Sequence, residues 1–355
     1  MEEHECKAIS MNKPKLVMLQ WPSDLGGADT RLKDLIKLLH KDWDITCVPN
    51  DPFRLTENEN VAFLNNYGVK YCLLDQLPQK YEGVAFSCCN FRIFKESWRI
   101  QAARDRGLKI IWANDMMWSD PEEIDAITKG WVDMVVFTSE FHRAVLLPKV
   151  LAANPLQKHG LLANYFDADT WNKEPIFRNS SSITIGKSSR DDWMKYPEDF
   201  PLFYERLGDD MSFDILGWGK ELAKKYAWHK FDSRWNLRQV NSTPVLEWLK
   251  AIDVFVYCSN YKFIENQSRS IVESMLSGVP VIAPRKYNFP NMIWDRRCGW
   301  LWDDEPELKE GMRRMKDPST RKIFSERSKK WALDIWCDKQ SAIDGWNQCV
   351  QEIMK

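Results

Sequence analysis

Residues 253–284, DVFVYCSNYKFIENQSRSIVESMLSGVPVIAP, decide the fold class of this chain. Val254–Tyr257 is a short run of β-branched and aromatic residues, which is typical of a buried strand. A polar loop follows, and a helix is then predicted to begin near Ser268–Ser270 and to end at Gly278, before a second strand at Val281–Ala283. A loop between a strand and a helix lies at the carboxyl end of a parallel sheet, where α/β proteins bind ligands.

Two carboxylates flank the predicted start of this helix, Glu265 in the loop and Glu273 in the first turns. This E-x7-E spacing before a helix that ends in SGVPVIAP resembles the retaining, nucleotide-sugar-dependent glycosyltransferases of family 4, which have the GT-B fold. The resemblance implies that Glu265 contacts the donor sugar and that Glu273 holds the ribose. It also implies that the residues between them face the donor diphosphate and sugar, namely Asn266, Gln267, Ser268, Arg269 and Ser270.

Ordinary helix chemistry offers an alternative for both carboxylates. Ser270–Glu273 also has the pattern of a capping box, in which Glu273 would bond to the amide of the N-cap residue. Glu265 would then be a solvated acid in a loop. Helix starts favour phosphate through their unpaired N–H groups and positive dipole end, and the matches described below favour the ligand-site interpretation.

Composition indicates a globular protein whose overall charge does not attract nucleic acid. The length of 355 residues suits two domains. A net charge of −1 gives no overall attraction for nucleic acid or anionic membrane. Nine scattered cysteines without a CxxC pair, no apolar leader and no long apolar run predict a cytoplasmic protein, in the host cytoplasm if the source is viral.

Short β-rich segments alternate with helical segments through the first half of the chain. The predicted strands are 15–21, 44–49, 69–74, 83–88, 109–114 and 132–137. The predicted helices are 30–41, 57–68, 94–107 and 120–130. This alternation predicts βαβ units and a mostly parallel sheet.

Gly26 and Gly27 lie between the first predicted strand and the first predicted helix, for which Asp29 or Thr30 is the expected N-cap. Glycines there let the backbone approach a ligand closely. The resemblance implies that the pair lies near the donor diphosphate and the acceptor, and a plain tight turn is the alternative.

Asp115 follows the strand predicted at 109–114, in a region where the family carries a histidine motif close to the acceptor. The resemblance therefore makes Asp115 a candidate acceptor contact or proton acceptor. An Asx turn or a cap is an equally good interpretation.

Residues 159–178 are predicted to link the two halves of the chain. Asp167-Ala168-Asp169 within them has the form of a D-x-D metal motif, but its context favours a turn and a helix cap. The five histidines show no metal-ligand spacing, so neither an essential metal nor any cofactor besides the donor is expected.

The second half opens with a predicted strand at 182–187, and the loop after it resembles the family pattern G-R-x-S-R-x-D-x-x-K. The resemblance implies that Lys187, Arg190 and Lys195 neutralise the donor diphosphate, which would stabilise the departing charge without a metal. A solvated basic loop is the alternative. Gly217, in FDILGWG, is expected close to the nucleotide.

The loop before the helix predicted at 238–251 reads the base in the family. Arg238, Gln239 and Val240 are therefore weak candidates for the base contact.

The resulting fold prediction is α/β GT-B, with two Rossmann-like, doubly wound parallel-sheet domains facing a cleft. The resemblance also implies that the C-terminal helices cross back onto the N-terminal domain. The predicted units are a flexible tail at 1–14, an acceptor-side domain at 15–165, a nucleotide-sugar-binding domain at 166–335 and a returning helix at 336–355.

The resemblance implies metal-independent transfer of a sugar from a nucleotide-sugar donor to a glycan, lipid or small-molecule acceptor, with retention of configuration. The residues expected to carry it are Glu265, Lys195, Arg190 and Asp115. Alternatives are a GT-B enzyme that glycosylates a modified DNA base, a nucleotide-sugar epimerase, and a binding protein that has lost catalysis.

Overall fold

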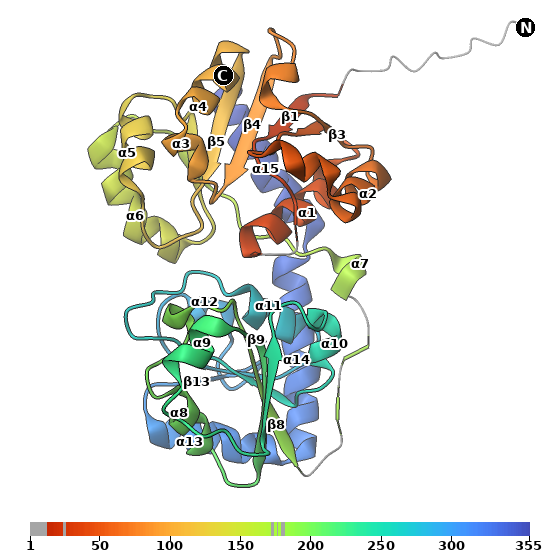
Figure 1. Ribbon diagram of the computed structural model, residues 1–355, viewed down its shortest axis with the longest axis vertical. Coiled ribbons are helices and arrows are strands. Elements are labelled where there is room, and N and C mark those ends of the chain that lie inside the picture. The colour runs from red at the N-terminus through yellow and green to blue at the C-terminus, as the bar shows by residue number, and fades with distance from the viewer. Residues whose placement is uncertain (1–12, 24–25, 172–173, 176, 179–181) are drawn as a thin grey trace, which may run out of the picture.

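The computed structural model describes residues 13–23, 26–171, 174–175, 177–178 and 182–355. Figure 1 shows two sheets, each flanked by helices, stacked one above the other along the long axis of the molecule. The predicted N-terminal tail lies outside the described residues except for its last two positions.

Within the described residues, the first sheet has seven parallel strands in the order β3-β2-β1-β4-β5-β6-β7. They are β1 (Lys15–Met18), β2 (Asp44–Cys47), β3 (Lys70–Tyr71), β4 (Gly83–Cys88), β5 (Leu108–Ala113), β6 (Met134–Phe137) and β7 (His159–Leu161). The helices are α1 (Gly27–Leu39), α2 (Asn58–Asn66), α3 (Arg92–Lys95), α4 (Trp98–Asp105), α5 (Pro121–Thr128) and α6 (Glu140–Ala153). Because the chain winds outward in both directions from β1 and β4, the switch point of this sheet lies between these two strands.

The second sheet, again of described residues only, has six parallel strands in the order β10-β9-β8-β11-β12-β13. They are β8 (Ile183–Ser188), β9 (Met211–Trp218), β10 (Trp235–Gln239), β11 (Val254–Val256), β12 (Val281–Pro284) and β13 (Trp300–Trp302). The helices are α7 (Ala168–Trp171), α8 (Phe200–Glu205), α9 (Lys220–Lys225), α10 (Val245–Leu249), α11 (Arg269–Leu276), α12 (Phe289–Met292), α13 (Glu305–Lys316) and α14 (Pro318–Trp336). Its switch point lies between β8 and β11, so the loops that follow these two strands face a crevice.

Alternate residues of each strand enter different cores, which is why both faces of each sheet are covered. On β1, Leu16 and Met18 pack with α1, whereas Val17 packs with the α4–α6 side. Strands buried on both faces are typical of parallel sheets in α/β proteins. The predicted two-domain, parallel α/β architecture is therefore confirmed.

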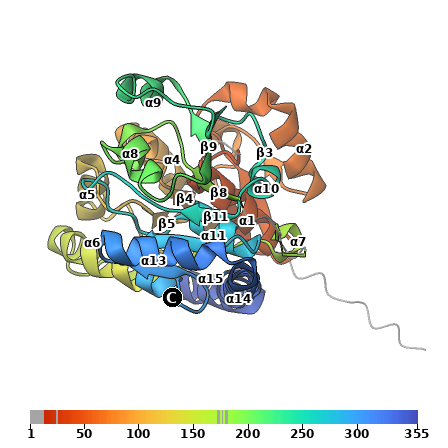
Figure 2. The same ribbon diagram turned by 90° about the horizontal axis from the view of Figure 1, so that it is seen from below.

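The C-terminal helices cross from the second domain back to the first, as predicted. α14 packs against α11, while the last helix, α15 (Lys339–Met354), lies against α1 and β7. Figures 1 and 2 show both in blue, with α15 beneath the first sheet. Trp346 of α15 is fully buried, with its ring 5.6 Å from that of Phe86 and 5.8 Å from that of Trp43.

Several predicted boundaries are wrong in an informative way. α1 begins at Gly27 with Gly26 as N-cap, because the Asp29 carboxylate is taken by Gln20 and Ser23 rather than by a helix amide. β7 lies inside the predicted linker, where its pairing with β6 supplies the order that local sequence does not. β10 was not predicted, since WNLRQ is a half-polar edge strand without an apolar run.

No helix of the described residues is both long enough and apolar enough to span a bilayer.

Candidate functional site

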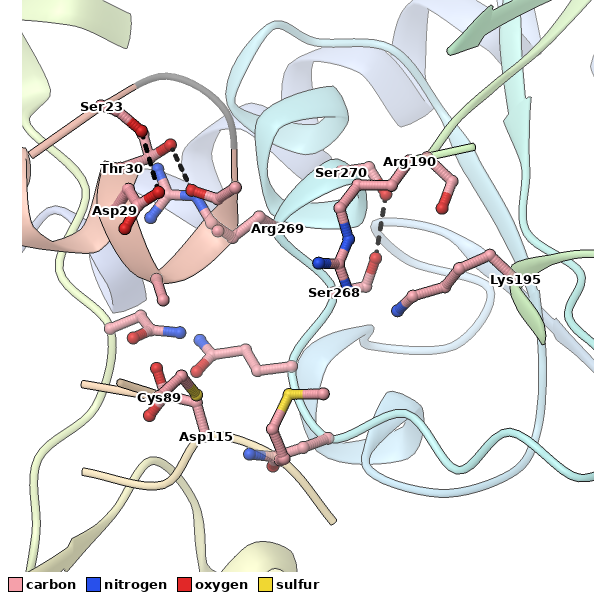
Figure 3. A pocket seen from close by; sticks show the side chains of 18 of the residues that line it. Ser23, Asp29, Thr30, Cys89, Asp115, Arg190, Lys195, Ser268, Arg269 and Ser270 are labelled. Atoms are coloured by element: carbon pink, nitrogen blue, oxygen red, sulfur yellow. Dashed lines mark hydrogen bonds between the residues drawn. The ribbon is translucent and has the colours of Figure 1, made fainter. Parts of the chain in front are cut away.

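A cavity of about 830 Å³ lies between the two domains, at the switch points of both sheets. The loops after β1, β4 and β5 line it from the first domain, and the loops after β8, β10 and β11 line it from the second, together with the end of β9. Figure 3 shows the two walls facing each other, with Asp29, Thr30, Cys89 and Asp115 on one side and Arg190 and Lys195 on the other. The volume suits a ligand of nucleotide-sugar size.

Glu265 and Lys195 meet in the wall of this cavity. The Glu265 Oε2 atom accepts hydrogen bonds from Lys195 Nζ at 2.9 Å and from the Tyr257 hydroxyl at 2.8 Å. Lys195 Nζ also lies 3.7 Å from the centre of the Phe263 ring. The structure thus brings together two predicted site residues as an ion pair, and the two donors hold the carboxylate in one orientation.

Arg190 is the exposed cation of the β8 loop. It lines the cavity, and among the described residues its guanidinium has neither an ion pair nor a side-chain hydrogen bond. Figure 3 shows it extending toward Ser268 and Ser270, whose hydroxyl oxygens lie 2.9 Å apart. An unpaired guanidinium beside a helix start provides strong donors for a phosphate.

The capping-box alternative for Glu273 is wrong. Ser268 is the N-cap of α11 without a side-chain bond, and the nearest ionic partner of Glu273 is Arg269, with Nε 3.4 Å from Oε1. Burial raises the pKa of the Glu273 carboxyl, and the Arg269 charge opposes that shift. Glu273 lines the cavity together with Asn266, Gln267, Ser268, Arg269 and Ser270.

The prediction that Lys187 neutralises the donor diphosphate is not supported by its position. Lys187 is buried and does not line the cavity. Its Nζ donates to the Cys258 carbonyl at 2.7 Å and lies over the rings of Tyr196 and Tyr257. Burial lowers the pKa of Lys187 to about 8. The contact with phosphate expected from the resemblance is therefore not available to it here, since the ammonium group is held behind the wall.

The three predicted glycines all line the cavity. A Cβ atom on Gly27 would lie 3.3 Å from Arg269 Cδ, so the start of α1 approaches α11 closely. Gly217 has φ +100°, and a Cβ there would lie 1.9 Å from the Ser189 carbonyl oxygen. Only glycine fits this position, because the end of β9 passes directly against the backbone of the β8 loop.

Asp115 lines the first-domain side with φ +58°. Its carboxylate is ion-paired with the buried guanidinium of Arg31 and accepts from Cys88 Sγ at 2.8 Å. The Asx turn considered for this segment is made by Asn114, whose Oδ1 accepts from the Met116 amide at 2.9 Å. Asp115 therefore faces the cavity as a carboxylate neutralised by Arg31.

Cys88, Cys89 and Asp115 are grouped closely enough to share a metal ion, with their ligand atoms within 4.8 Å of one another. However, the Arg31 guanidinium already contacts both Asp115 and Cys88. A fixed positive charge opposes a second cation at the same place, so we assign no metal to this group.

Of the three residues predicted to contact the base of the nucleotide, two do not line the cavity. Arg238 lies in β10, where its guanidinium pairs with Asp214 at 2.7 and 2.8 Å, and it does not line the cavity. Gln239 ends the same strand and is likewise absent from the wall. Val240 does line the cavity, with Asn241 and Thr243 beside it.

Sequence reasoning missed two sets of contacts. Arg31 is a buried charged residue in a helix whose Leu32, Leu35, Ile36 and Leu39 recur at helical spacing, and a charge beside this apolar face was the available signal. Asn266 joins the domains, bonding to Thr138 Oγ1 at 2.5 Å and to Ser139 Oγ at 2.8 Å. The local sequence around Asn266 does not predict its contacts with Thr138 and Ser139.

Comparison with known proteins agrees with the geometry. Residues 170–331 match the model of the family described as glycosyl transferases group 1. A sequence search of curated proteins finds no relative.

Among solved structures, Anabaena HepE in complex with UDP and glucose superposes with a TM-score of 0.70 at 13% identity, covering 95% of this chain and 99% of that one. A glycosyltransferase from Rickettsia africae gives 0.70 at 12% identity, covering 97% and 100%. Sucrose-phosphate synthase from Thermosynechococcus elongatus gives 0.66 at 13% identity, covering 97% and 99%. At these identities the likeness establishes the shared GT-B fold.

Proposed function

We propose that this chain, whose residues 170–331 match the model of glycosyl transferases group 1, transfers a sugar from a UDP-sugar to a hydroxyl group of an acceptor. The observation that supports this most directly is the interdomain cavity. Arg190, which has no ion pair among the described residues, converges there with the start of α11 and the Lys195–Glu265 pair. UDP as the nucleotide is supported by the similarly folded Anabaena protein, whose crystal structure is a complex with UDP and glucose.

The proposed chemistry depends on stabilising a departing diphosphate. Arg190 and the first turn of α11 supply positive charge and N–H groups where the leaving oxygen would gain charge. These groups are part of the chain, so the reaction is proposed to need no metal. Retention is proposed to follow front-face attack, with the leaving phosphate accepting the proton of the acceptor hydroxyl.

Glu265 is proposed to orient the transferred sugar. Its Oε1 accepts no hydrogen bond from the described residues, whereas Oε2 is held by Lys195 and Tyr257. A carboxylate with one oxygen held and the other open is suited to bind a sugar hydroxyl. Glu273 is proposed to take the ribose hydroxyls.

The acceptor is proposed to be a neutral, hydroxyl-bearing molecule such as a glycan. The first-domain wall offers the amides of Asn50 and Asn90 and the aromatic ring of Trp118. Among the described residues, the cationic side chain of that wall is Arg54, and it is paired with Glu57 at 2.6 Å. A paired cation attracts duplex phosphates weakly, so this wall disfavours the DNA-modifying alternative.

A donor panel tests the proposed function. The protein is incubated with UDP-, GDP-, ADP- and dTDP-sugars in the presence of EDTA, and both thermal stabilisation and nucleotide release are followed. Stabilisation and release with UDP-sugars are expected. Stabilisation without release would favour a non-catalytic binding protein, and dependence on added divalent metal would contradict the proposed mechanism.

Affinity for the donor is expected to fall several-fold as pH rises through about 8, because Lys187 then loses its charge close to Lys195 and Glu265. The folded pKa lies below the unfolded value of 10.5, so the unfolded chain binds the extra proton between these values. The titration of Lys187 therefore raises the free energy of unfolding as pH rises through that window, while the affinity for the donor falls. Titration calorimetry with UDP at about pH 7 and about pH 9 measures this fall in affinity. Lys187→Met should lack it, and an identical fall in this variant would contradict the assignment.

A further inference from the structure

The segment around α9 projects from the second domain and exposes two tryptophan rings. Figure 2 shows α9 at one edge of the molecule, clear of both sheets. Trp228, in the turn that follows α9, is 56% exposed. Trp193, the first residue of the 3-10 helix η3 (Trp193–Lys195), is 45% exposed. Two large rings exposed on neighbouring segments indicate a contact surface, whereas single exposed apolar residues are ordinary.

Contacts between α9 and η3 place the two rings near the same helix end. Lys225 Nζ donates to the Trp193 carbonyl at 2.9 Å and lies 5.6 Å from the centre of the Trp193 ring. The ring of Trp228 lies 6.4 Å from that of Tyr226, the residue that follows Lys225. The two tryptophans therefore flank the end of α9.

The helix α9 is amphipathic. Leu222 and Tyr226 are four positions apart and are buried in the core of the second domain. Lys220 and Lys224 are also four positions apart, and both are exposed, so they project from another face of the helix. Trp228 lies a further four positions along the chain, beyond the end of this lysine row.

Positive charge is concentrated in this segment of an almost neutral chain. Residues 220–234 contain five Lys or Arg residues and two acidic residues, whereas the whole chain has a net charge of −1. Two of the five cations are paired, Lys225 with Glu198 at 3.3 Å and Arg234 with Asp232 at 2.9 Å.

Three lysines of the segment keep their charge available. Lys220, Lys224 and Lys230 are exposed, and none of them has an ion pair or a side-chain hydrogen bond with the described residues. Glu221 is the acidic residue of the segment that is likewise without an ion pair in the described parts of the chain. The free lysines and the two exposed rings are called the α9 surface below; its residues are Lys220, Lys224, Lys230, Trp193 and Trp228.

The chemistry of the α9 surface fits a lipid bilayer with anionic headgroups. Indole rings favour the interface between headgroups and acyl chains, because one end of the ring is apolar and its N–H group is polar. Lysine stems lie along apolar surface while their ammonium groups reach phosphate, and each lysine near an anionic leaflet strengthens binding by about fivefold. Nucleic-acid binding depends on many phosphate contacts, and three free lysines supply few of them.

We propose that the α9 surface docks the protein on a lipid bilayer with anionic headgroups. The lysines contact headgroup phosphates, and the rings of Trp193 and Trp228 enter the interface. Since η3 begins with Trp193 and ends with Lys195, which lines the cavity, the α9 surface adjoins the second-domain wall of the cavity. This docking is independent of the proposed sugar transfer, because it requires neither donor nor acceptor.

Co-sedimentation of the full chain with phosphatidylcholine vesicles, prepared with and without phosphatidylglycerol, tests the docking. The protein is expected to sediment with the anionic vesicles and to stay in the supernatant with phosphatidylcholine alone. Raising NaCl from about 0.1 M to about 1 M should release most of it, because salt screens exposed charges.

Two variants of the α9 surface separate the charges from the rings. Lys220→Gln/Lys224→Gln/Lys230→Gln should lower the affinity for anionic vesicles by about a hundredfold, as for three lysines near the membrane. Trp228→Ala should lower it by about tenfold, the effect of one large side chain that no longer enters the interface. The lysine variant changes exposed positions without ion pairs in the described structure, so it should unfold at the wild-type temperature and bind UDP as wild type does.

Trp294→Ala is the matched control. Trp294 is also 56% exposed, but its ring lies 5.5 Å from that of Trp331 in α14, on the side of the second domain opposite α9 in Figure 2. This variant should sediment as wild type does.

The inference would be overturned by a wild-type protein that does not sediment with anionic vesicles or that sediments equally with both kinds. Wild-type affinity in the lysine variant, or an equal loss in Trp294→Ala, would also overturn it. Retention on single-stranded DNA without vesicle binding would identify a nucleic-acid surface instead. Because UDP binding is measured separately in solution, absence of docking and absence of the proposed donor are distinguishable.

Discussion

Replacing Glu265 by glutamine is expected to lower the turnover number by about a hundredfold to a thousandfold, the range observed when one preorganised polar group is removed from a catalytic site. Glutamine retains the size of the side chain and its contact with Tyr257, but it removes the charge that pairs with Lys195 at 2.9 Å. Lys195 then loses its anchor in the cavity wall, and the sugar loses an oriented acceptor of its hydroxyl hydrogen bond. Initial rates of transfer from the donor selected by the panel measure the effect.

The affinity for UDP without its sugar should change little in Glu265→Gln, because the proposed contacts of this side chain are to the sugar. Glu198→Gln is a suitable control, since Glu198 is an exposed acid on the loop that carries Lys195, and its nearest cation, Lys225, lies 3.3 Å away. Wild-type turnover in Glu265→Gln would disprove the assigned role. A parallel loss of UDP affinity and thermal stability would show that Glu265 is structural.

Gly217→Ala is expected to destabilise the protein by about 3–5 kcal/mol, within the range that diagnoses a specific steric defect. Two causes act together. An alanine at φ +100° is strained, and its Cβ would lie 1.9 Å from the Ser189 carbonyl oxygen, which is backbone and cannot turn aside. The end of β9 must then move away from the β8 loop, which also carries Arg190.

Gly130→Ala separates these two causes. Gly130 has φ +65°, but a Cβ there would meet no atom within 4 Å. It should cost only about 1–2 kcal/mol, the cost of the left-handed conformation alone. Urea unfolding of both variants measures the difference, and equal destabilisation would show that the contact with Ser189 is irrelevant.

The sequence correctly predicted the local secondary structure of the site. The β11–loop–α11 unit lies where its apolar run, polar loop and glycine stop predict it, because each signal acts over a few residues. The pairing of Glu265 with Lys195 was not predicted, although both were named, because these residues lie on loops after different strands of the second sheet. Position on a strand end predicts the neighbourhood of a residue, whereas its bonding partner depends on the packed side chains.

Lys187 illustrates the limit most clearly. Its place in the G-R-x-S-R-like pattern favoured a phosphate contact, but burial and the Cys258 carbonyl hold its ammonium group away from the cavity. Asp115 and Arg238 behave in the same way, since Arg31 and Asp214 neutralise them. A sequence pattern states which charges are near a site, and desolvation decides which of them remain available to a ligand.

The amino-acid sequence by itself determined that this chain forms parallel α/β units, because hydrophobic periodicity and turn residues act locally along the chain. The returning C-terminal helix was expected from the family resemblance. The tertiary structure alone decided the interdomain contacts: Arg269 with Asp34 and Asn266 with Thr138 and Ser139. These partners are more than a hundred positions apart, and the hydrogen bonds between them exist only once both sheets are folded and their switch points face each other.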